Sequence, residues 1–195
     1  MTRAGAGGLA LLALVASARG DTPTSTVVLA LTSTDALASS ADFVAAFAGS
    51  AEAVAGLAAI AQDSSGDTGV QLRAIRGLAE FPASGSVPHD ALVAIIGASS
   101  GAQSGSRVLV LRAAIESLGA LAAAGHAEPA DEALLAGHLN DASRDVRATT
   151  ARALGELCDT SAATPLHVRA GGETSVQVKL AISEALRVLA TCTPS

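Results

Sequence analysis

Few residues of this chain have the types and spacing that catalysis needs, and one short motif stands out. Residues 97–101 read Gly-Ala-Ser-Ser-Gly, which fits the G-x-S-x-G pattern of a serine nucleophile at Ser99. That chemistry needs a strand before the serine, a helix after it, and an acid and a histidine nearby. The motif falls where a turn between two helices is expected, and no series of strands accompanies it. A serine hydrolase acting through Ser99 is therefore the alternative, and we expect no catalytic residues.

The histidines do not form a pattern that would bind a metal or a cofactor. No two of them are spaced i, i+3 or i, i+4, and no cysteine lies near one at ligand spacing. The chain also lacks a phosphate loop and a dinucleotide fingerprint. We predict exposed or helix-capping histidines, no metal site and no cofactor. The four residues are His89, His126, His138 and His167.

The first 18 residues have the three parts of a secretory signal peptide. Arg3 supplies a positive charge, residues 9–15 form an apolar run, and Ala16-Ser17-Ala18 is a small-x-small cleavage site. An ordinary buried helix is the alternative. We predict cleavage after Ala18 and an exported protein, periplasmic or secreted, with no membrane attachment after cleavage.

Export changes the interpretation of the two cysteines. In an oxidising compartment Cys158 and Cys192 can pair, and both lie at the ends of neighbouring predicted helices. Two separate buried thiols, each acting as a small apolar side chain, are the alternative. The sequence leaves both open.

Composition favours a helical protein and argues against two classes of partner. Half of the residues are hydrophobic, many of them alanine, which favours helices, and the only aromatic residues are Phe43, Phe47 and Phe81. The formal net charge is -6, whereas nucleic acids and anionic membranes attract clustered lysine and arginine. Base stacking would also need more aromatic side chains. We therefore expect a protein partner.

A pattern that occurs four times is the strongest signal in the sequence. Each copy begins with a valine, and a leucine follows eight positions later. On a helix, offsets 0, 4, 8 and 11 fall at roughly 0°, 40°, 80° and 20°, so they form one apolar stripe. Offset 7 is always small, which lets neighbouring helices approach closely. The valines are Val70, Val110, Val146 and Val178, the leucines are Leu78, Leu118, Leu154 and Leu186, and the small residues are Gly77, Ser117, Ala153 and Ala185.

Offset 6 points away from the stripe and is charged in every copy. We call these four residues the charged ridge: Arg76, Glu116, Arg152 and Glu184. They can form a polar groove for a partner protein. Alternatively, their alternating signs pair each residue with its neighbour in the next copy, which packed helices 8–10 Å apart would allow.

A shorter apolar segment and a turn-rich linker precede each of these helices. The predicted unit is therefore helix–turn–helix, present four times within residues 50–195. Residues 19–49 are predicted to form an N-terminal capping region or degenerate repeat, with Phe43 and Phe47 filling the end of the core. The preceding segments span residues 54–61, 92–98, 134–139 and 166–170.

The third copy resembles a HEAT repeat of the short, bilin-lyase-like kind. Residues 139–155 contain an Asp in the turn, Val-Arg at the start of the second helix, and Ala-x-Ala-Leu-Gly. The other copies carry Gln71, Leu111 and Lys179 at the arginine position. The matching residues are Asp141, Val146, Arg147, Ala151, Ala153, Leu154 and Gly155.

The resemblance implies an all-α fold, a right-handed α-solenoid of about four to five HEAT-like repeats, with an irregular helical bundle as the alternative. It also implies a non-catalytic scaffold or adaptor. A structural subunit of an envelope complex is the other possible role. Chromophore chemistry is disfavoured, because export and the scarcity of aromatics do not suit a bilin pocket.

Overall fold

The protein is all-helical throughout the described residues. The computed structural model describes residues 25–32, 38–101 and 105–192, and within these ranges it contains helices and no strand. The predicted all-α class is therefore confirmed. The predicted signal peptide, residues 1–18, and its cleavage site after Ala18 lie outside the described residues. Two compact units divide the chain between Ile95 and Ile96, and each is described by itself.

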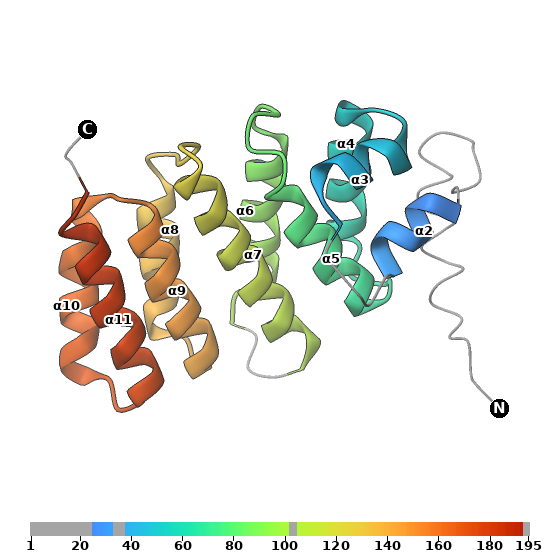
Figure 1. Ribbon diagram of the computed structural model, residues 1–195. Helices are drawn as coiled ribbons and strands as arrows, with labels where there is room; N and C mark the ends of the chain where they lie inside the picture. The colour runs from blue at the N-terminus through green and yellow to red at the C-terminus, as the bar shows by residue number, and fades with distance from the viewer. Residues whose placement is uncertain (1–24, 33–37, 102–104, 193–195) are drawn as a thin grey trace. The chain divides into compact units, whose positions relative to one another are not determined.

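The described residues of the first unit before α6 form helices that Figure 1 shows in blue to green. They are α2 (Ser25–Thr32), α3 (Ser40–Phe47), α4 (Ser50–Gln62) and α5 (Thr68–Leu78). Helix α4 packs against α3 and α5, and α2 contacts α3 and α5. Helix α6 (Val87–Ser99) begins in this unit and ends in the second. Helices α2 and α3 thus lie within the described part of the capping region predicted for residues 19–49.

Helix starts in the first unit follow from local side-chain chemistry. Ser39 and Asp42 form a capping box at α3, in which each side chain accepts a hydrogen bond from the other residue's backbone N–H. Asp67 caps α5 by accepting from the Val70 N–H at 3.1 Å. Phe43 and Phe47 are both buried, as predicted, and the ring of Phe43 lies 6.4 Å from that of Phe81 between centroids.

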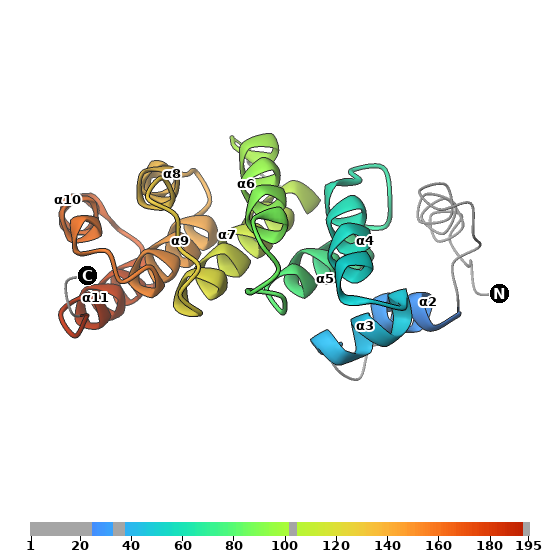
Figure 2. The ribbon, with the colours of Figure 1, turned by 90° about the horizontal axis from the view of Figure 1, so that it is seen from above.

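The second unit places its helices in two layers. Figure 2 shows α8 and α10 on one side and α7, α9 and α11 on the other. Helix α9 packs against both α7 and α11. The α-helices are α7 (Ser106–Ala123), α8 (Asp131–Gly137), α9 (Arg144–Glu156), α10 (Ala163–Gly172) and α11 (Val176–Leu189), and the short 3-10 helices are η1 (His138–Asn140) and η2 (Thr160–Ala162).

Small residues set the spacing between α7, α9 and α11. A Cβ added to Gly119 on α7 would lie 3.0 Å from the Ala153 Cα of α9, and one added to Gly155 on α9 would lie 3.0 Å from the Ala185 Cα of α11. The backbones therefore meet where a glycine faces an alanine, and Ala153 and Ala185 are the small residues predicted for close approach. Arg187 takes the position on α11 that corresponds to Gly119 and Gly155.

The predicted apolar stripe is buried in all four second helices, with two exceptions, Leu157 and Leu186. The four valines are buried, as are Leu78, Leu118 and Leu154, each 0% exposed. Leu157, at offset 11, and Leu186, at offset 8, are only partly buried, so the stripe is less deeply buried at these two positions than the pattern predicted. In the described part of the chain, the helix of Leu154, α9, packs between α7 and α11. Among these residues, the helix of Leu186, α11, has only α9 as a neighbour in the same layer, so less of its surface is covered.

Among the described residues, no single helix is long and apolar enough to cross a membrane. The bent pair α3–α4, with 95° between its members, meets the length and composition test only when the two are taken together.

The close approach at Gly155 predicts a strong effect of side-chain size. Gly155→Val should lower the free energy of unfolding by about 1–3 kcal/mol, because the new side chain would be forced into the Ala185 backbone. Gly97→Ala is the matched control, since nothing lies within 4 Å of an added Cβ there; it should be neutral or stabilise α6 by up to about 1 kcal/mol. Urea unfolding followed by circular dichroism measures both. Equal stability of the Val variant and the parent protein would contradict close packing at this point.

Candidate functional site

The charged ridge is exposed to solvent, as predicted from the repeat. Arg76 lies on α5 of the first unit, while Glu116, Arg152 and Glu184 lie on α7, α9 and α11 of the second. Glu184 accepts two hydrogen bonds from Arg187 of its own helix, at 2.6 and 3.0 Å. Glu184 thus forms an ion pair with a residue of its own repeat, Arg187.

Glu116 and Arg152 both influence a third charged residue, Glu156. The Glu156 carboxylate lies against Gly119 of α7. Partial burial raises the pKa of Glu156, the charge of Glu116 raises it further, and the charge of Arg152 lowers it. The ridge residues of α7 and α9 therefore share one electrostatic environment, which an incoming charged group would also feel.

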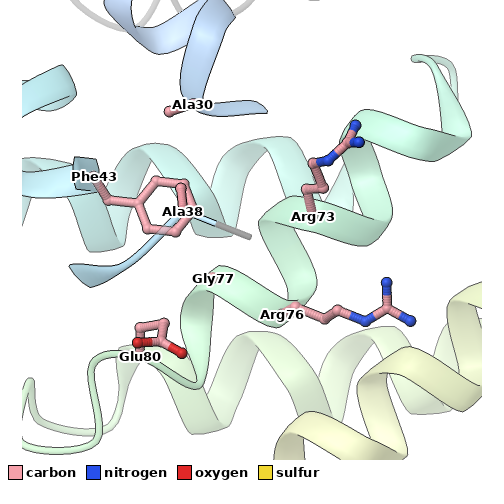
Figure 3. A pocket seen from close by; sticks show the side chains of 7 residues that line it. All are labelled: Ala30, Ala38, Phe43, Arg73, Arg76, Gly77 and Glu80. Atoms are coloured by element: carbon pink, nitrogen blue, oxygen red, sulfur yellow. The ribbon is translucent and has the colours of Figure 1, made fainter. Parts of the chain in front are cut away.

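A small hollow lies beside the ridge residue of the first unit. It is open to solvent and has a volume of about 20 Å³, and Figure 3 shows its lining. The buried ring of Phe43 and Gly77 lie in its middle, the side chains of Arg73 and Arg76 extend toward one side, and Glu80 lies on the other. The Arg73 guanidinium donates to the Leu31 carbonyl oxygen of α2 at 3.2 Å. The lining residues are Ala30, Ala38, Phe43, Arg73, Arg76, Gly77 and Glu80.

The position after each valine ties the second helix to what precedes it, by different means. Gln71 is buried and donates to the Ala61 carbonyl oxygen of α4 at 2.9 Å. Arg147 donates to the carbonyl oxygens of Asp141 and Ala142 in the turn before α9, at 2.8 and 3.1 Å. Leu111 is fully buried, and Lys179 is exposed. Gln71 therefore replaces the arginine of the family pattern but still donates a hydrogen bond to the backbone that precedes its helix.

Arg147 also takes part in an ion-pair cluster that sequence reasoning missed. The Glu173 side chain is 0% exposed and accepts from Arg147 at 2.8 and 3.0 Å and from Arg169 at 2.6 and 3.0 Å. The backbone N–H groups of Thr174 and Ser175 also donate to it, at 2.9 and 2.8 Å. The i, i+4 spacing of Arg169 and Glu173 was a signal that could have suggested this pair.

These donors determine the protonation of Glu173. The Arg147 guanidinium holds the pKa of Glu173 far below its ordinary value, against the opposing effect of burial, and the Ser175 N–H, Arg169 and the Thr174 N–H add to the lowering. A buried carboxylate with two guanidinium partners is fully satisfied, so the cluster fastens the end of α10 to the start of α9.

A disulfide joins Cys158 to Cys192, which settles the choice between a bond and two separate thiols in favour of the bond. The two Cα atoms lie 5.5 Å apart, and the bond connects the residues that follow α9 and α11. Cys158 has a φ of 56°, in the left-handed region where glycine is usual. The loop that the bond closes contains α10 and α11.

The other residues considered for chemistry are not brought together. Ser99 is a buried residue at the end of α6, and the segment before it, where a nucleophile elbow requires a strand, is helical. His126 and His167 are exposed, but His89 and His138 are buried, contrary to the prediction for exposed residues; His138 does occupy the C-cap of α8. Burial lowers the pKa of His138, and Asp141 partly opposes this. The described residues contain no group of three or more side chains suited to a metal ion.

No protein-family model matches the chain, and no curated protein matches it significantly.

The Glu173 cluster predicts a characteristic response to acid. Because the folded-state pKa lies below the ordinary value of 4.5, the ionised carboxylate stabilises the fold above about pH 4.5, and this stabilisation is lost as the pH falls from there toward the folded-state pKa. Glu173→Gln should lower the free energy of unfolding at pH 7 by about 3–5 kcal/mol, since it leaves two guanidiniums without their carboxylate. It should also flatten the dependence of stability on pH below 4.5. Urea unfolding at a series of pH values measures both effects.

Glu184→Gln, in an exposed pair with Arg187, is the matched control and should keep the parent protein's acid dependence nearly unchanged. A Glu173→Gln protein whose stability fell with acid as steeply as the parent's would show that the cluster does not govern this behaviour.

The disulfide predicts a second, independent loss of stability. Replacing both cysteines by alanine should lower the free energy of unfolding by about 4 kcal/mol, because the sequence separation of 34 residues makes a long closed loop. A variant with Cys158→Gly and Cys192→Ala should be less affected than the double alanine variant, since glycine adopts the left-handed conformation freely. Thermal unfolding compares the variants. Intact mass after alkylation of the native, unreduced protein checks the bond, and two alkylated cysteines would contradict it.

Proposed function

We propose that the chain is an exported, non-catalytic scaffold or adaptor of HEAT-like helical repeats that binds a protein partner along the polar faces of its second helices. The observation that carries the proposal is the division of every second helix into two faces. The stripe valines are buried, while the ridge residues of the same helices are exposed. Within the second unit, the ridge residues lie on α7, α9 and α11, whose close packing holds them at a fixed spacing that suits recognition of another protein.

The arrangement of the repeats as a right-handed solenoid belongs to this proposal. The helix pairs α4–α5, α8–α9 and α10–α11 support it, because in each pair a first helix packs against a second helix that carries the stripe. Close packing of α7, α9 and α11 is the kind of neighbour-to-neighbour contact on which repeat proteins depend. The resemblance of residues 139–155 to a HEAT repeat points the same way.

Export is supported by two features from opposite ends of the chain. The first 18 residues have the pattern of a signal peptide. The disulfide is of the kind that persists in an oxidising compartment.

Reversing ridge charges tests the binding surface. The double variant Glu116→Lys, Arg152→Glu keeps the net charge and should weaken a partner that co-purifies from the exported fraction by tenfold or more, with an unchanged helical circular dichroism spectrum. Arg144→Glu, an exposed arginine at the other end of α9, is the matched control and should keep full binding. Unchanged affinity of the double variant, measured by titration calorimetry, would count against this surface.

The pKa of Glu156 provides an internal check that the reversals act where intended. Glu116→Lys alone should lower the pKa of Glu156, because it removes a charge that raises it, and Arg152→Glu alone should raise it. NMR titration of the Glu156 carboxyl group measures both shifts.

A further inference from the structure

Positive charge in the first unit is concentrated at one place. Within residues 25–32 and 38–95, the only arginine or lysine residues are Arg73 and Arg76, one turn apart on α5. Both line the hollow that Figure 3 shows. The same residues of the chain contain six carboxylates: Asp42, Glu52, Asp63, Asp67, Glu80 and Asp90. The hollow is therefore a local cationic spot in an otherwise acidic unit.

The Arg73 side chain is oriented by one hydrogen bond, which uses only one of its N–H donors. One of its N–H groups donates to the Leu31 carbonyl oxygen, at the end of α2. A guanidinium has five N–H donors in a planar fork, so this single bond orients the side chain and leaves others to reach a ligand. An arginine oriented in this way suits a planar carboxylate.

The rest of the hollow limits what can accompany that carboxylate. Its middle is apolar, formed by the Phe43 ring and by Gly77, where an added Cβ would lie 2.9 Å from ring atoms. Its volume is about 20 Å³, far below the range of about 300–1,000 Å³ for small-molecule sites, so it admits no more than the end of one side chain. Glu80, on the side opposite the two arginines, would repel a second anionic group. The space therefore suits one acidic side chain with small apolar neighbours, and a chain of phosphates is disfavoured.

We propose that this hollow binds an acidic residue of a peptide segment in the partner protein, with the carboxylate on Arg73 and Arg76 and an adjacent small apolar side chain over Phe43. The inference deepens the proposed scaffold function, on which it rests, by naming the chemistry that the partner presents to the first unit.

The test uses a defined peptide and the full-length exported chain. The probe is acetyl-Ala-Ala-Glu-Ala-Ala-amide, and its counterpart with Gln in place of Glu is the control ligand. Titration of the isotope-labelled protein, followed by NMR, should give saturable shifts at the Arg73 Nε–H and the Gly77 amide, with at least tenfold weaker binding of the Gln peptide.

Substitutions separate binding in the hollow from general attraction to positive charge. Arg73→Gln should reduce affinity for the Glu peptide at least tenfold. Arg73→Lys keeps the charge and a donor for the Leu31 carbonyl oxygen but lacks the planar fork, so it should weaken peptide binding less than Arg73→Gln does. An unchanged circular dichroism spectrum of the Lys variant would show that its loss of affinity does not come from unfolding. Arg144→Gln, at an exposed arginine at the start of α9 and outside the charged ridge, is the matched control and should bind as the parent protein does.

Three results would overturn the inference: shifts that do not saturate, equal affinity for the Glu and Gln peptides, or equal losses in the Arg73→Gln and Arg144→Gln variants. Failure here is distinguishable from failure of the scaffold function. If ridge reversal releases the natural partner but the Glu peptide does not bind, the scaffold function stands and Arg73 only fastens α2 to α5. If the peptide binds but ridge reversal has no effect, the hollow is a binding site and the ridge is not.

Discussion

The close approach of α7, α9 and α11 is the constraint on which the second unit depends. Each contact brings a glycine of one helix against an alanine of the next, Gly119 to Ala153 and Gly155 to Ala185. Helices that meet nearly backbone to backbone cannot slide past one another without opening a void, because protein interiors are packed at the density of organic crystals. The exposed faces of these helices are consequently held at a fixed spacing, which any recognition by the charged ridge requires.

The ends of α9 and α11 are fastened by chemistry of different kinds. Near their first turns, Arg147 binds Glu173, and the Gln177 amide donates to Asp145 at 3.2 Å. Beyond their last turns, the disulfide joins Cys158 to Cys192. Side-chain packing in the middle of the pair is thus supplemented by polar bonds at one end and a covalent bond at the other. The α10–α11 pair is held to α9 even though α11 has a neighbour in its own layer on one side only, among the described residues.

Periodic positions were predictable from the sequence, and positions that depend on long-range partners were not. The stripe valines and the ridge residues follow helical geometry, so their burial and exposure could be derived from spacing alone. Leu186 fits the same spacing but is less buried, because burial of a stripe leucine also depends on neighbouring helices. The spacing carries no information on those neighbours.

The candidate site divides in the same way. Arg76 was predicted from the repeat, but the hollow beside it depends on α2 and α3, which lie outside the pattern. Glu173 was missed because its main partner, Arg147, is 26 residues away, and no local rule connects them. The cysteines are also far apart in the chain, yet their pairing could be considered, since two cysteines allow only one bridge.

Arg187 has a consequence for how the packing could extend. In α7 and α9 the corresponding position is a glycine that admits the next helix, but in α11 it is a long side chain bound to Glu184. A further helix docking in the same way would have to displace this ion pair and bury its charges, which is costly. At this position α11 therefore lacks the small residue by which α7 and α9 admit a neighbour, whereas Val176 and Leu180 on the same face of α11 leave apolar surface exposed.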